Sequence, residues 1–177
     1  VSSTLGLDME FDDSRYVIGF DPSHGIGKDY TVLIVLRQDA EGVVHFVNMW
    51  RRNDFPPDRQ ADVIIEWSHR YGKAPIAAED VGFQRLYEAL IIQKGAHLDY
   101  RASKASNKNR LRTWFEQGKF QWPYGNIETR NMVNIIFDEL ENHVWKSGDI
   151  VDVGKHNDTV MALAHALDQF NKFDVTK

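Results

Sequence analysis

Three strand-like apolar runs follow one another near the N-terminus, and they constrain the fold of this chain more than any other feature. They cover residues 15–21, 30–37 and 43–51, and they are rich in the β-branched and aromatic residues that favour strands. The segments between them are short and polar. Strands joined by short turns pair in antiparallel fashion, because a parallel pair needs a crossover of a dozen or more residues. We therefore predict an antiparallel meander over residues 15–51.

Helical and strand-like segments alternate after the meander. A helix should begin at Pro56 and Pro57 and end at Gly72, and the apolar run at residues 75–79 is expected to form a buried strand. Further helices are expected at about residues 83–94, 106–117, 128–143 and 157–170, with a fifth strand at 97–101. This order predicts an α/β domain with a central mixed sheet, in which two parallel strands extend the antiparallel meander and helices flank both. It resembles the element order of the ribonuclease H-like fold.

Helical spacing indicates which apolar side chains build the core. In the helix at 83–94, Leu86, Leu90 and Ile91 form the stripe expected to face inward. The aromatic residues after the next helix are also expected in the core rather than as platforms for nucleic-acid bases. These are Trp114, Phe115, Phe120 and Trp122.

Length and composition bound the class of protein. The chain has 177 residues with 42% hydrophobic side chains, which suits one domain, predicted here at 15–172 after a linker or disordered lead-in at 1–14. It has no cysteine, which excludes disulfides, thiolate zinc sites and a cysteine nucleophile. No apolar stretch approaches the roughly 20 residues needed to span a bilayer. No signal peptide is visible either, so we expect neither a membrane protein nor a secreted one.

Asp21 ends the first apolar run and is the first candidate for chemistry. Taken alone, an aspartate before a proline more often starts a turn through its side chain. However, the following loop contains Gly25 and Gly27, which leave room for a ligand to approach closely. Asp29 would lie opposite Asp21 across the hairpin, where it is either a supporting ligand or, as we favour, a plain turn residue.

Two further acidic positions stand at the ends of predicted elements. Glu79 and Asp80 close the fourth strand, and only one can share the face of Asp21 because neighbouring strand residues point to opposite sides. We prefer Glu79 and keep Asp80 as the alternative. Asp158 begins the last helix, where an acid is ordinarily a cap, but it would point to the same sheet edge. His156 is a candidate auxiliary ligand or proton carrier, although an isolated histidine is more often a surface residue.

Together these carboxylates would suit divalent cations. Oxygen ligands without cysteine favour Mg²⁺ or Mn²⁺ over zinc. Two such ions, about 3.5–4 Å apart, would activate the attacking water and stabilise the leaving oxygen in phosphodiester hydrolysis. We therefore predict a site for two ions on Asp21, Glu79 and Asp158, incomplete without metal because the carboxylates repel one another.

A locally basic segment could contact the phosphates of such a substrate. The net charge of −5 argues weakly against a nucleic-acid partner, but residues 101–119 contain six lysines and arginines and one acid. A solvated helix face is the ordinary explanation of such a run; beside a nuclease centre, phosphate binding becomes plausible. The candidate DNA-binding residues are Lys104, Lys108, Arg110 and Arg112.

Several motifs, taken in order and spacing, resemble the C-terminal nuclease domain of the large terminase subunit of tailed bacteriophages. The resemblance covers about residues 15–170. The motifs are Gly19–Gly25 with Lys28–Tyr30, then Ala78–Gln84, Lys104–Lys119 and His156–Ala164. None is specific alone. Many relatives carry two adjacent acids in the last motif, whereas this chain has Asn157 before Asp158, so a fourth carboxylate is not implied there.

The resemblance implies a metal-dependent endonuclease that cuts concatemeric viral double-stranded DNA during genome packaging. Its acidic triad would map onto Asp21, Glu79 and Asp158. It also implies an N-terminal ATPase domain in the full-length chain, the portal protein and small terminase subunit as partners, and a place at the packaging motor in the bacterial cytoplasm. No Walker motif is present, so this segment is not expected to hydrolyse ATP.

Three other classes of protein share some of these features. A junction resolvase shares the fold and would prefer branched DNA. A sugar-kinase or actin-like ATPase half also begins with an aspartate after a strand, but it needs a second phosphate-binding hairpin that we do not find. A non-catalytic DNA-docking module of the motor would keep the fold and bind no Mn²⁺.

Overall fold

The computed structural model describes residues 15–23, 27, 29–79, 82–103, 108–146, 149–152 and 157–171. The predicted lead-in at 1–14 lies outside these residues, so the domain boundaries remain a prediction. The helices and strands are β1 (Arg15–Asp21), β2 (Thr31–Gln38), β3 (Val44–Arg52), α1 (Pro57–Arg70), β4 (Ile76–Glu79), α2 (Gly82–Gln93), β5 (Tyr100–Ser103), α3 (Lys108–Glu116), β6 (Phe120–Gln121), α4 (Ile127–Glu141), β7 (His143–Lys146), β8 (Asp149–Asp152) and α5 (Asp158–Asn171).

The main sheet has six strands in the order β5-β4-β1-β2-β3-β6. The strands β1, β2 and β3 form the predicted antiparallel meander, while β4 runs parallel to β1 and β5 runs parallel to β4. The predicted α/β class with a mixed sheet is therefore confirmed. Two features were not predicted: β6, which pairs with the edge of β3, and the separate hairpin of β7 and β8.

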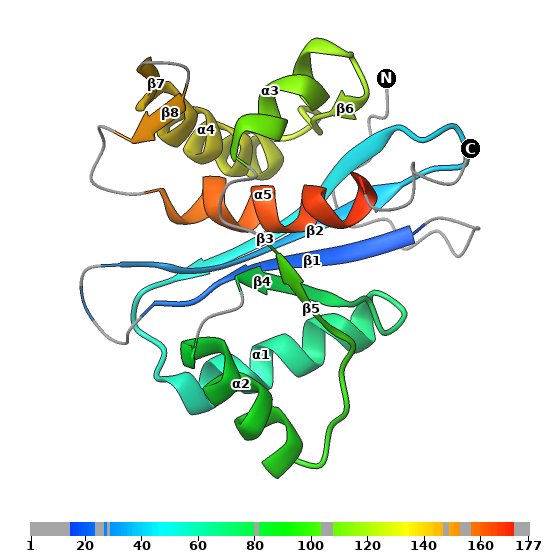
Figure 1. The fold of residues 1–177 in the computed structure, drawn as a ribbon. Coiled ribbons are helices and arrows are strands. Elements are labelled where there is room, and N and C mark those ends of the chain that lie inside the picture. The colour runs from blue at the N-terminus through cyan, green and yellow to red at the C-terminus, as the bar shows by residue number, and fades with distance from the viewer. Residues whose placement is uncertain are drawn as a thin grey trace.

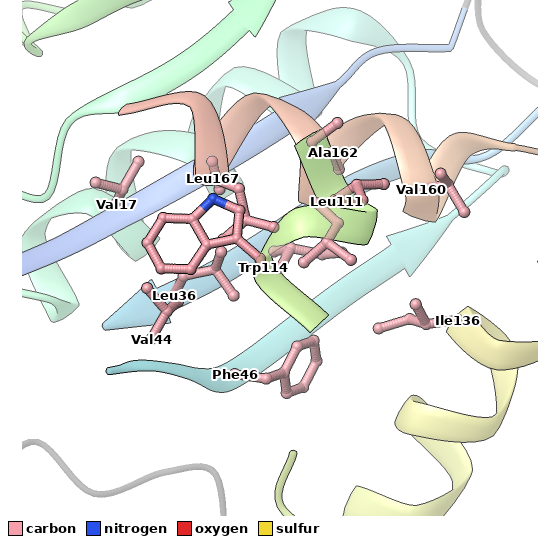
Figure 2. Close-up of a cluster of buried hydrophobic side chains, with 14 of the residues drawn as sticks. Val17, Leu36, Val44, Phe46, Leu111, Trp114, Ile136, Val160, Ala162 and Leu167 are labelled. Atoms are coloured by element: carbon pink, nitrogen blue, oxygen red, sulfur yellow. The ribbon is translucent and has the colours of Figure 1, made fainter. Parts of the chain in front are cut away.

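Helices cover the two faces of the sheet as separate layers (Figure 1). The last helix, α5, lies directly on one face, with α3 and α4 beyond it, while α1 and α2 cover the opposite face. Each face has its own core. Figure 2 shows the core on the α5 face, where Trp114 of α3, Ile136 of α4 and Leu167 of α5 gather over side chains of the sheet.

The α5 helix is buried on almost all sides. Every side chain from Asp158 to Phe170 except Met161 is buried. The reason is its position between the sheet below and α3 and α4 above. At Gly19 of β1, this packing is so close that an added Cβ atom would lie 1.9 Å from the carbonyl oxygen of Ala162.

The core predictions hold with one correction. The aromatic residues Trp114 and Phe120 are buried, and Phe115 and Trp122 pack against the same cluster. Leu86, however, was wrongly placed in the core, because its side chain is 44% exposed. The next residue, Tyr87, is fully buried instead and makes an edge-to-face contact with Phe20 at 5.0 Å between ring centroids.

The turn between β2 and β3 is organised by one carboxylate. Asp39 accepts hydrogen bonds from the N–H groups of Glu41 (3.1 Å) and Val43 (2.9 Å), and its other oxygen lies 2.7 Å from Nε2 of His45. Burial opposes ionisation of this group, but the bonds from His45 and from the backbone outweigh it, so the pKa of Asp39 lies below its ordinary value.

We expect Asp39→Ala to lower the free energy of unfolding by about 1–2 kcal/mol at pH 7, the usual cost of lost hydrogen bonds to a charged acceptor. Because the folded-state pKa is depressed, the contribution is present above the unfolded pKa and is lost as pH falls through the folded pKa. Urea unfolding at pH 7 and at about pH 3 should show the difference between wild type and variant shrinking. Glu41→Ala, at the exposed neighbour, is the control, and a pH-independent difference would contradict this explanation.

None of the helices in the described part of the chain is both long and apolar enough to cross a membrane.

Candidate active site

The structure places three predicted carboxylates at one end of the sheet. Asp21 ends β1 and Glu79 ends β4, which is the parallel neighbour of β1. In the register of this parallel pair Gly19 lies beside Ala77, and two residues further along both strands Asp21 falls beside Glu79. Asp158 is the first residue of α5, whose N-terminus lies at the same side of the molecule (left in Figure 1).

Strand alternation shows which face each carboxylate occupies. In β1, Ile18 and Phe20 belong to the core under α1 and α2, whereas Val17 belongs to the core under α5. Asp21 therefore falls on the α5 face. In β4, Ile76 and Ala78 face α1 and α2, while Ala77 faces α5. Glu79 thus shares the α5 face with Asp21, as preferred from the sequence.

Asp158 is tied to the same edge through the backbone. Its side chain is buried, and Oδ2 accepts a hydrogen bond from the N–H of Tyr30 at 3.0 Å. Tyr30 immediately precedes β2, and Val32 of β2 is the direct partner of Asp21. A carboxylate has several acceptor positions, so this bond is compatible with a further role as a ligand.

A buried polar network fixes the chain just beyond Asp21. The N–H of Ser23 donates to Oγ1 of Thr31 at 3.1 Å, and the two hydroxyls lie 2.8 Å apart. The hydroxyl of Tyr87 donates to Oε1 of Gln60 at 2.6 Å and lies 3.5 Å from the carbonyl oxygen of Ser23. Burial raises the pKa of Tyr87, which therefore stays a neutral donor. Sequence patterns do not reveal this network, because its members come from four separate segments of the chain.

The auxiliary candidates are less well supported. Asp29 was expected opposite Asp21, and this was wrong, because Val32 occupies that position and Asp29 is exposed before β2 begins. Asp80 and His156 lie outside the described residues, and so does Lys104.

The rest of the predicted DNA-binding set lies on α3. Lys108 and Arg110 belong to its first turn, where the side chains are not described. Arg112 is exposed and pairs with Glu116 one turn later.

The three carboxylates are suitable ligands for a hard divalent cation, and the backbone places their residues at one end of the sheet. All three groups are carboxylates, the oxygen ligands that Mg²⁺ and Mn²⁺ take. Among the residues that the structure describes, however, no three histidine, aspartate or glutamate side chains are arranged so that they could hold a metal ion. Closely spaced carboxylates repel one another without a counter-charge.

The fold and this acidic edge define the class of protein: an α/β domain of the ribonuclease H-like type. The family described as "Terminase RNaseH-like domain" matches residues 18–170, so the chain belongs to that family. The resemblance inferred from the sequence is thereby confirmed. No curated protein sequence matches the chain significantly.

Solved structures of terminase nucleases share the fold. The nuclease domain of the large terminase of Thermus phage P74-26 is 26% identical, with a TM-score of 0.64, over 89% of this chain and 80% of that one. The large terminase nuclease of the thermophilic phage G20c with bound magnesium is 25% identical, with a TM-score of 0.65, over 89% and 82%. The g2p nuclease domain of bacteriophage SPP1 with bound Mn is 20% identical, with a TM-score of 0.60, over 88% and 86%, and shows the fold alone.

Proposed function

We propose that this domain is a Mg²⁺- or Mn²⁺-dependent endonuclease that cleaves concatemeric viral double-stranded DNA during genome packaging. The observation that carries the proposal is the placement of Asp21, Glu79 and Asp158 at one sheet edge, on the α5 face, in a chain of the terminase RNaseH-like family. The G20c relative has been solved with bound magnesium, with bound cobalt and with bound zinc, which supports a site for divalent cations. The choice of Mg²⁺ or Mn²⁺ rests on the all-carboxylate ligand set.

The three carboxylates would hold the metal ions, and two ions are proposed. When bound, the ions would supply an activated water and charge stabilisation for the leaving oxygen. The contribution of the chain is to fix the anionic oxygens on rigid elements, two on strand ends and one on a buried helix. Asp80 and His156 are retained as auxiliary candidates, whereas Asp29 is not, because Val32 occupies the position opposite Asp21.

DNA would be held beside this edge by the basic segment that includes Lys104, Lys108, Arg110 and Arg112. Arg112 now pairs with Glu116, but both side chains are more than half exposed. An exposed pair of this kind contributes little to stability, so a phosphate can displace the carboxylate at small cost.

We infer the remaining partners from the family. They are an N-terminal ATPase domain in the same full-length chain, the portal protein and the small terminase subunit. The working place would be the packaging motor in the cytoplasm of the bacterial host.

The chain should cut supercoiled plasmid DNA in the presence of Mg²⁺ or Mn²⁺ and should lose this activity completely when the metal is chelated. Carboxylates alone cannot supply the Lewis acid that phosphodiester hydrolysis needs here. Conversion to nicked and linear forms on an agarose gel measures the effect, and activity should return when excess Mn²⁺ is added. Cleavage that continues in chelator would contradict the proposal.

Two substrate and binding controls separate the alternatives. A four-way junction cut in strong preference to linear duplex would favour a resolvase. Because no three described side chains are set to hold a metal, a docking module is the second candidate. Titration with Mn²⁺ by calorimetry tests it, since a docking module should bind none.

A further inference from the structure

Arg51 lies in the same cross-strand row as Asp21 and on the same face of the sheet. Asp21 pairs with Val32, and Val32 pairs with Arg51 on the next strand. Directly opposed residues in an antiparallel sheet point to the same side, and Val32 belongs to the core under α5. Arg51 is therefore two strands, or about 10 Å, from Asp21 on the same face.

The guanidinium group of Arg51 is held between two neighbours. It lies over the ring of Tyr30, with the guanidinium carbon 3.4 Å from the ring centroid. Its Nη2 atom also forms an ion pair with Oε1 of Glu139 at 3.6 Å. The side chain of Arg51 is 19% exposed and that of Glu139 is 7% exposed. These are the conditions under which a guanidinium is fixed rather than mobile.

Glu139 comes from α4 and reaches the first turn of α5. Its Oε2 atom accepts a hydrogen bond from the N–H of Thr159 at 2.8 Å and another from the Thr159 hydroxyl. Thr159 follows Asp158, so Glu139 caps the helix end that carries the candidate ligand. Helix N-termini favour such an acceptor, because their first N–H groups have no partner within the helix.

These contacts close a ring of five residues that includes Asp158. Tyr30 donates its N–H to Asp158, Thr159 follows in the chain and bonds Glu139, and Glu139 pairs with Arg51, which lies on the ring of Tyr30. The members come from α4, α5, β3 and the residue before β2. Asp158 is thus held from both sides, by a backbone donor and by a cap on the next residue.

We propose that Glu139 and Arg51 are positioning residues that set the orientation of Asp158 for metal binding. This inference rests on the proposed metal-dependent function. Neither residue belongs to the predicted ligand set or to the predicted DNA-binding set. A buried ion pair is a weak source of stability compared with apolar packing, which fits a role in orientation. Residues that orient a ligand typically change metal affinity or activity by about 10- to 100-fold when they are removed.

The test uses the 177-residue chain and compares two substitutions at Glu139 and two at Arg51. Glu139→Ala removes the cap and the ion pair, whereas Glu139→Gln keeps an oxygen that can accept from Thr159. We expect Glu139→Ala to weaken Mn²⁺ binding by about 10-fold or more and to lower kcat similarly, with little change in KM for DNA. Glu139→Gln should recover most of both. Arg51→Ala should fall between them, and Arg51→Lys should recover only part of the loss, because lysine keeps the charge facing Glu139 but cannot stack a planar guanidinium on Tyr30.

Two control variants separate positioning from stability and from charge. Tyr71→Phe removes a buried hydrogen bond from Asn48 (3.0 Å) on the opposite face of the sheet, so it lowers the melting temperature without touching Asp158. Arg52→Met removes an equal charge from the next position of β3, where the side chain is 50% exposed and pairs with Asp54. Both should keep wild-type Mn²⁺ affinity, measured by calorimetry well below their melting temperatures.

The outcomes distinguish the two proposals. If the wild-type chain binds Mn²⁺ and cuts DNA, and Glu139→Ala binds Mn²⁺ with unchanged affinity, the inference is overturned but the proposed function is not. Loss of affinity in Tyr71→Phe as large as that in Glu139→Ala would also overturn it, because stability would then explain the effect. If Glu139→Ala does not fold, Glu139→Gln and the two Arg51 variants decide. A wild-type chain that neither binds Mn²⁺ nor cuts DNA would overturn the proposed function and this inference with it.

Discussion

Replacing Asp21 with asparagine should abolish DNA cleavage and leave the fold intact. The substitution keeps the shape of the side chain but removes the negative charge that would balance a divalent cation. Loss of about 4 kcal/mol of transition-state stabilisation corresponds to a rate lower by on the order of 10³-fold. Single-turnover cleavage with Mg²⁺ measures the rate, and the melting temperature should stay close to that of wild type, because Asp21 ends a strand and is only half-buried.

The same series covers the other carboxylates. Asp158→Asn should lose cleavage equally, since the amide oxygen can still accept from Tyr30 but carries no charge. Glu79→Gln should behave likewise, whereas Asp80→Asn should retain activity if β4 presents Glu79 to the α5 face as the strand alternation indicates. Asp54→Asn, at an exposed carboxylate after β3, is the matched control. Full activity in Asp21→Asn or Asp158→Asn would rule out the triad.

Local patterns predicted most of the fold, because each strand of the meander carries its own apolar run and turn. The strand β6 has only two residues, which are too few to show a periodicity in the sequence. It is defined by its pairing with β3, a contact between distant segments. The β7–β8 hairpin was not predicted, partly because the preceding helix was expected to continue to residue 143. In the structure, α4 ends at Glu141. The apolar pairs flanking the sequence Ser147-Gly148 were the available signal of a turn.

The positions of the candidate ligands could be predicted from the sequence, but the residues that surround them could not. Asp21 and Glu79 stand at strand ends, a position visible in the sequence. Glu139 was missed because a glutamate on a helix is ordinarily a solvated residue. A signal did exist: Glu139 lies three residues after Ile136 and four after Ile135, on the apolar side of α4. A charged residue on that stripe breaks the local rule, and such breaks tend to mark functional or strained sites.

Gly19→Ala should strongly destabilise the domain, although it adds only one methyl group. The added Cβ would lie 1.9 Å from the carbonyl oxygen of Ala162, 2.8 Å from its carbonyl carbon and 3.0 Å from Cβ of Ala166. Two of these atoms belong to the backbone of a buried helix, so no side chain can rotate to relieve the overlap. The α5 helix must move away from β1, which opens the core beneath it. We expect a loss of about 3 kcal/mol in the free energy of unfolding, at the upper end for overpacked sites.

The displacement should also reach the active site, because Ala162 lies one turn after Asp158 on the same helix. The cleavage rate of Gly19→Ala should therefore fall by more than its unfolded fraction explains. Urea titration gives the unfolded fraction, and the cleavage rate is measured at the same temperature. Gly95→Ala is the control: Gly95 has φ +78° and nothing within 4 Å of an added Cβ, so only backbone strain of about 1–2 kcal/mol applies. If the two variants lose equal stability, α5 does not sit on β1 as closely as the structure has it. If Gly19→Ala also cleaves DNA at the normal rate, the packing of α5 on β1 does not determine the position of Asp158.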